Sequence, residues 1–179
     1  MTKLKQILFC VLLGALPLLA AAGNDSGSMN AKKSLPQAER PIPVELRGKT
    51  IEIRPGITIA EARRMLSSVI PEAPSVDIKG MLQYDVQLVP DSAPVTIVFY
   101  FDNRDVVESV VLDAYLKEQN PPAVKLIAWL NAQGIKPMKQ RRQQTIWRFG
   151  RWNIEHTDEG SGDDSAYRIE LTRVKQGAR

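Results

Sequence analysis

The first 22 residues have the pattern of an export signal, and this pattern restricts how the rest of the chain can fold. Lys3 and Lys5 precede an apolar run over residues 7–19, and three alanines at residues 20–22 supply the small side chains that a signal peptidase requires. The run is too short to span a bilayer comfortably, which takes roughly 20 apolar residues. We therefore expect a signal peptide at residues 1–22 and a mature, periplasmic protein.

The chain has a single cysteine, Cys10, which lies inside this apolar run. The cleaved protein would therefore fold without a disulfide bond, even in an oxidising compartment. A lipoprotein would carry its modified cysteine at the end of the apolar run, whereas Cys10 lies near the start. An uncleaved membrane anchor is the alternative reading, and the three alanines favour cleavage.

The cleaved chain divides into a linker and one domain. Residues 23–43 predict a flexible linker, because they combine small polar residues with Pro36, Pro41 and Pro43, which prevent regular structure. Residues 44–179 predict a single domain that is long enough to bury a hydrophobic core.

Two helix starts are indicated by their caps. Thr58 and Glu61 have the spacing of a capping box, in which the hydroxyl and the carboxylate each accept a hydrogen bond from a free backbone N–H. Asn120 precedes two prolines, which are tolerated in a first helical turn. Gly134 is suited to the left-handed position that ends the second helix.

Alternating apolar residues predict strands, most of which follow a helix. The expected strands cover residues 49–54, 82–88, 95–101, 106–112, 144–157 and 167–171. Runs of strands joined by short turns indicate an antiparallel sheet. We therefore predict an α+β fold with helices on one face of the sheet. The order of elements suggests two tandem helix-plus-strands units, at about residues 44–114 and 120–175.

Residues 55–112 resemble a known family of envelope proteins. They contain a Pro-Gly turn before the capped helix, and then residues 98–103 (Val-Phe-Tyr-Phe-Asp-Asn) before a valine-rich return strand. This order resembles the BamE (SmpA/OmlA) family of outer-membrane assembly accessories. That family is lipidated on a cysteine that the mature chain lacks, so membrane anchoring is not implied. The two units also resemble, in topology only, the β-lactamase inhibitor protein fold. Both resemblances imply protein binding.

Residues with catalytic or metal-binding chemistry are few. His156 is the only histidine, and it is expected to pack at a sheet end; with no cysteine in the mature chain, no zinc site is expected. Four acids, Asp158, Glu159, Asp163 and Asp164, crowd one loop, but their spacing differs from that of a calcium-binding EF-hand. We expect a solvated hairpin tip there, and neither a cofactor nor a metal.

The most distinctive binding candidate is a basic and aromatic segment in the second unit. Trp and Arg are the residue types most enriched in binding hot spots. Gly150 is expected to bulge the strand. Two alternatives stay open, since the aromatic residues suit a core and the basic residues suit a solvated face. The candidate binding residues are Trp147, Arg148, Arg151, Trp152, Arg141 and Arg142.

These features favour an exported, non-enzymatic protein-binding module with a protein partner in the cell envelope. An inhibitor or immunity-type protein is slightly favoured over an envelope-assembly accessory. The net charge of +4 is small, and an exported protein is not expected to bind nucleic acid. Peripheral contact with membrane or wall stays open. The alternatives are an acid-based cell-wall hydrolase and a lipid- or glycan-binding domain.

The export signal can be tested directly. N-terminal sequencing of the protein from fractionated cells is expected to start near Gly23, because cleavage should follow the three alanines. A cytosolic protein that starts at Met1 would contradict the predicted export.

Overall fold

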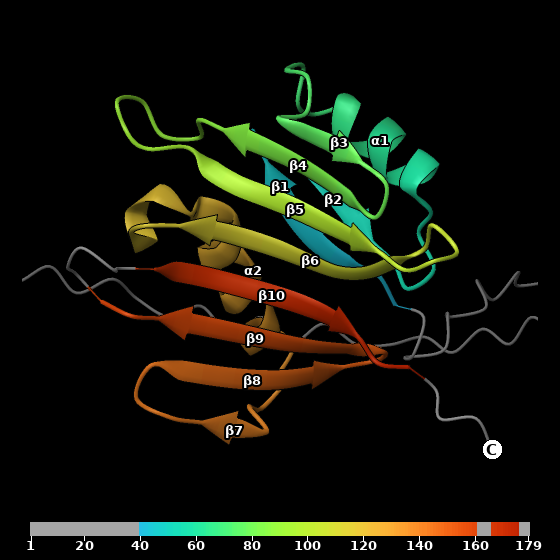
Figure 1. Ribbon diagram of the computed structural model, residues 1–179. Helices are drawn as coiled ribbons and strands as arrows, with labels where there is room; N and C mark the ends of the chain where they lie inside the picture. Colours follow the sequence, from blue (N-terminus) through green and yellow to red (C-terminus); the bar gives the residue numbers. More distant parts are fainter. Residues whose placement is uncertain (1–39, 161–165, 176–179) are drawn as a thin grey trace, which may run out of the picture. The chain divides into compact units, whose positions relative to one another are not determined.

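The computed structural model describes residues 40–160 and 166–175 (Figure 1). Within them the predicted α+β class is confirmed, with an eight-stranded antiparallel sheet, a two-stranded sheet and two α-helices. The predicted signal peptide lies outside the described residues, as does most of the predicted linker. Order begins slightly earlier than predicted, because Ile42 is buried and already belongs to the first strand.

Thirteen helical and strand segments follow one another along the described chain. The strands are β1 (Ile42–Leu46), β2 (Lys49–Ile53), β3 (Val76–Ile78), β4 (Met81–Val86), β5 (Val95–Phe101), β6 (Val107–Ala114), β7 (Lys139–Gln140), β8 (Gln144–Phe149), β9 (Trp152–Asp158) and β10 (Tyr167–Arg173). The helical segments are α1 (Ile59–Ser67), the 3₁₀ turn η2 (Lys117–Gln119) and α2 (Pro121–Ala132). No described helix is long and apolar enough to cross a membrane.

The large sheet consists of two four-stranded meanders that meet at its centre. Its strand order is β3-β4-β5-β6-β10-β9-β8-β7, so α1 precedes the first meander and α2 precedes the second. Strands β6 and β10 pair antiparallel, with Val110 opposite Leu171 and Leu112 opposite Ile169. The element order therefore matches the predicted pair of helix-plus-strands units.

The register of the sheet separates its side chains onto two faces. One row across six strands is buried throughout and consists of Leu82, Phe99, Val110, Leu171, Ile154 and Trp147. Both α-helices and the β1–β2 hairpin lie on this face and complete one hydrophobic core (Figure 1). Side chains between these positions point to the opposite side, which we call the outer face. No described helix or strand lies on the outer face.

Helix α1 begins at the predicted capping box. The Thr58 hydroxyl accepts a hydrogen bond from the Glu61 amide at 3.3 Å, and the Glu61 carboxylate accepts one from the Thr58 amide at 2.9 Å. The Ile59 amide also donates to the Asp105 carbonyl at 2.9 Å. The start of α1 is therefore fixed to the β5–β6 turn.

Helix α2 begins at the predicted cap Asn120, whose side chain also reaches both central strands. The side chain is fully buried. Its Oδ1 accepts a hydrogen bond from the Ala123 amide at 3.2 Å. Its Nδ2 donates to the Leu112 carbonyl of β6 at 3.2 Å and to the Tyr167 carbonyl of β10 at 3.0 Å. One amide group thus joins α2 to both meanders.

The predicted bulge at Gly150 is wrong. Gly150 and Arg151 form the two-residue turn of the β8–β9 hairpin, with Phe149 paired to Trp152. The backbone of Gly150 has φ of 57°, a left-handed value that glycine adopts at little cost at the first position of such a turn. The alternating segment is therefore two strands.

Removing the two helix caps is expected to lower stability by different amounts. Thr58→Ala removes an exposed cap and should lower the free energy of unfolding by about 1 kcal/mol. Asn120→Ala should cost more, about 2–4 kcal/mol, because it removes a cap and leaves two buried carbonyl groups without their donor. Urea unfolding followed by circular dichroism measures both. Equal losses would show that the buried amide adds nothing to the cap.

Candidate functional site

The six residues predicted for binding do not form one surface. Trp147 and Trp152 are 3% and 0% exposed, so they occupy the core, one of the two positions that the sequence left open. Arg148 follows Trp147 in the strand and therefore points to the outer face, where it donates to Asn153 Oδ1 at 2.8 Å. The structure thus places adjacent tryptophan and arginine side chains on opposite sides of the sheet.

The other three arginines lie near the ends of β8. Arg141 and Arg142 are exposed in the turn between β7 and β8. Arg151 is partly buried in the β8–β9 turn, and its Nε is buried without a hydrogen-bond partner among the described residues. Because these turns lie at opposite ends of the strand, the arginines form no continuous basic surface.

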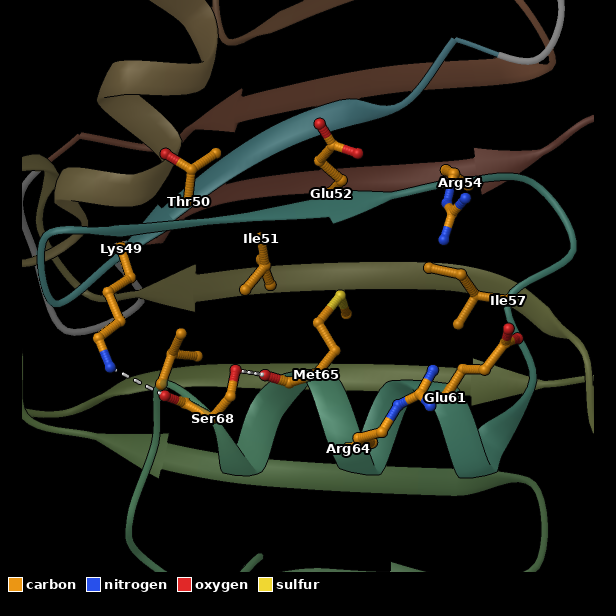
Figure 2. A pocket seen from close by; sticks show the side chains of 11 residues that line it. Lys49, Thr50, Ile51, Glu52, Arg54, Ile57, Glu61, Arg64, Met65 and Ser68 are labelled. Atoms are coloured by element: carbon orange, nitrogen blue, oxygen red, sulfur yellow. Dashed lines mark hydrogen bonds between the residues drawn. The ribbon is translucent and has the colours of Figure 1, made fainter.

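A hollow of about 470 Å³ lies between strand β2 and helix α1 (Figure 2). We call it the β2–α1 groove. Its lining residues are Lys49, Thr50, Ile51, Glu52, Arg54, Ile57, Glu61, Arg64, Met65, Ser68 and Val69. None of them belongs to the segment that the sequence singled out for binding.

The groove exists because β2 and α1 are joined at their ends. Arg47 and Gly48, both at positive φ, form a two-residue turn that leads into β2, as in tight hairpins. Lys49 Nζ then reaches across the groove and donates to the Ser68 carbonyl at 3.1 Å (Figure 2). Arg47 also forms an ion pair with Glu72. These contacts close one end, and the chain from β2 into α1 closes the other.

The backbone of β2 forms one wall of the groove. Four consecutive residues, Lys49 to Glu52, line the hollow, although side chains of a strand alternate between its two faces. The hairpin register explains this arrangement. A two-residue turn closes on the hydrogen-bonded pair Leu46–Lys49, so the N–H and C=O groups of Thr50 and Glu52 point away from β1. No other described strand pairs with this edge.

The inside of the groove is apolar. Ile51 from β2, Ile57 from the connection and Val69 after α1 are buried. Met65 of α1 lies between Ile51 and Ile57 (Figure 2). Burying an apolar side chain against such a surface yields roughly 25 cal/mol per Å² removed from water. The groove can therefore accept an apolar side chain next to a hydrogen-bonding edge.

Basic side chains border the end of the groove near the start of α1. Arg54 and Arg64 form no ion pair among the described residues, whereas Glu61 already bonds Thr58 through its carboxylate. The hydrogen bonds from Thr58 lower the pKa of the Glu61 carboxyl, and both arginines lower it further. Among the described residues, the lining charges left without an ion pair near this end are Arg54, Arg64 and Glu52, so the excess is positive.

The groove combines a strand edge, an apolar interior and basic side chains, which together suit it to bind a peptide segment. It has only two lining carboxylates, Glu52 and Glu61, and the Glu61 carboxylate is already bonded in the helix cap. Sequence reasoning predicted the β2 strand, the capping box and the first helix, but it missed the groove. A strand predicted beside a helix does not show which of its edges stays unpaired.

The histidine and the acidic loop show no metal-binding arrangement in the described part of the chain. His156 packs edge-on against Tyr167, with ring centres 4.7 Å apart, and burial lowers the pKa of its imidazole. Asp163 and Asp164 lie outside the described residues. No group of three or more His, Cys, Asp or Glu side chains within the described ranges is placed to hold a metal ion.

The positions of the tryptophans and arginines predict separate effects. Trp152→Ala should lower the free energy of unfolding by about 3–5 kcal/mol, because it empties a fully buried site. Arg148→Ala should change it by less than about 0.5 kcal/mol, since the side chain is exposed. Chemical unfolding followed by far-ultraviolet circular dichroism compares them. A Trp152→Ala protein as stable as the parent would contradict the core assignment.

Comparison with known proteins leaves the site to be interpreted from its geometry. No protein-family model, curated protein or solved structure matches the chain.

Proposed function

We propose that this protein is an exported, non-enzymatic protein-binding module of the periplasm, and that the β2–α1 groove binds an extended segment of a protein partner. The observation that carries the proposal is the edge of β2, which no strand of residues 40–160 and 166–175 other than β1 pairs with, beside an apolar hollow. Partner segments commonly add to exposed strand edges, where main-chain hydrogen bonds give affinity and side-chain pockets give specificity.

The dimensions of the groove suit a short extended segment. Strand β2 has five residues, and a strand advances about 3.4 Å per residue, so a segment of about five residues would run along it. Its main chain would bond the outward groups of Thr50 and Glu52. Every second side chain would lie on the face of Ile51 and enter the apolar hollow.

The basic rim adds a preference for an acidic residue in the segment. Arg54 and Arg64 pair with no carboxylate among the described residues, and an arginine can hold one through two parallel hydrogen bonds. Such pairs at the rim of an interface act mainly on association rate and selectivity. The preferred segment therefore combines apolar residues with a carboxylate near the start of α1.

Two roles fit this mode of binding. An inhibitor or immunity-type protein would block its target by adding a strand, and an envelope-assembly accessory would hold a partner in place. Both need a preformed edge, and the contacts of Lys49 and Arg47 with the residues after α1 supply one. We place the inhibitor or immunity role first.

The strand edge gives a sharp test. Thr50→Pro removes one outward N–H, and the natural Pro43 of β1 shows that the hairpin accepts proline where the N–H points away from the partner strand. Thr50→Ala is the matched control. In affinity capture from an envelope extract of the source cells, Thr50→Pro should bind the partner about tenfold more weakly, and Thr50→Ala should bind normally.

A second pair of variants tests the rim. Reversing the charge of Arg54 and Arg64 should slow association, whereas the same change at Arg141 and Arg142 should leave it unaltered. If association instead slows only when Arg141 and Arg142 are reversed, the interface lies at the β7–β8 turn and not at the groove. If no partner is captured and the protein hydrolyses wall material, the hydrolase alternative replaces this proposal.

A further inference from the structure

A second, smaller hollow opens at the outer face, on the opposite side of the sheet from the core. Its volume is about 200 Å³, and it is lined by Thr96, Asp113, Ala114, Tyr115 and Ala166. Asp113 is the one charged residue in this lining. It lies near the end of β6, in register with Thr96 of β5 and Arg168 of β10.

The Asp113 carboxylate is half-buried and forms no ion pair among the described residues. Burial raises the pKa of Asp113, and Glu159 raises it further, whereas Arg168 and a hydrogen bond from the Ala114 backbone lower it. Arg168 directs its guanidinium along β10 to Glu170, at 2.9 Å. The carboxylate is therefore stabilised by the Ala114 backbone amide and by the charge of Arg168, but it has no ion-pair partner among the described residues and can still pair with a cation.

The neighbours of Asp113 complete a site for a positive charge. Tyr115, just after the end of β6, is 62% exposed and lines the same hollow as Asp113. The face of an aromatic ring attracts cations. The Thr96 hydroxyl donates its proton to Asp85 at 2.8 Å, so its oxygen is left as an acceptor toward the hollow. An aromatic ring and two acceptors therefore surround a space large enough for one side chain.

We propose that the hollow over Asp113 binds the guanidinium or ammonium group of a basic side chain on a partner protein. The cation would form an ion pair with the Asp113 carboxylate and lie against the Tyr115 ring. It would also donate a hydrogen bond to the Thr96 hydroxyl oxygen. Of the neighbouring charges, Glu159 favours a cation at this site, and Arg168, whose charge opposes one, is already paired with Glu170. This site does not depend on the β2–α1 groove, which lies on the other side of the sheet.

The test uses small cationic probes on the mature protein. N-acetyl-arginine methylamide and N-acetyl-lysine methylamide are titrated while backbone amide signals are followed by NMR. Saturable shifts are expected at Thr96, Asp113 and Tyr115. The citrulline derivative, which has nearly the shape of the arginine probe but no charge, should bind at least about tenfold more weakly.

Variants assign the effect to the hollow. Asp113→Asn should weaken binding of the arginine probe about tenfold, and Tyr115→Leu should weaken it severalfold. Asp113→Asn should still fold, because it removes a charge that burial disfavours. Thr50→Pro should leave probe binding unchanged, which separates this site from the groove. Equal binding of the citrulline probe, or an unchanged affinity in Asp113→Asn, would overturn the proposal.

Discussion

The pairing of β6 with β10 is the contact on which the rest of the structure depends. Each meander is a separate run of local hairpins, and this one ladder makes them a continuous eight-stranded sheet. Two polar contacts secure it. Asn120 bonds a carbonyl on each strand, and Arg173 at the end of β10 forms an ion pair with Asp102 in the β5–β6 turn at 2.6 Å.

A sheet built in this way has one face for the core and leaves two binding opportunities elsewhere. The helices and the β1–β2 hairpin share the core face, and within the part of the chain that the structure describes the outer edge of β2 has no partner strand. On the outer face, polar side chains bond one another across neighbouring strands, as Thr96 of β5 does with Asp85 of β4. The half-buried Asp113 is an exception to this pattern. Both proposed sites are positions where the fold leaves a bonding capacity unused.

Local chemistry allowed much of the fold to be predicted from sequence. The caps at Thr58 and Asn120 depend on neighbouring residues alone, and strand alternation revealed most of the sheet. The site could not be predicted in the same way. Alternation alone places Arg148 on the face opposite Trp147, but only tertiary packing decides which of the two faces is buried. The groove and the Asp113 hollow join residues from separate elements, which no local pattern links.

The place of β10 in the sheet has a consequence for the order of folding. This last strand of the described chain occupies a central position, between β6 and β9, so the sheet is incomplete until the strand arrives. Contacts between residues far apart in sequence form slowly, because the loop entropy must be overcome first. Until β10 is delivered, the two meanders have no ladder that joins them. Under the proposed export, the part of the chain that has already crossed the membrane would therefore stay incompletely folded until residues 167–173 follow.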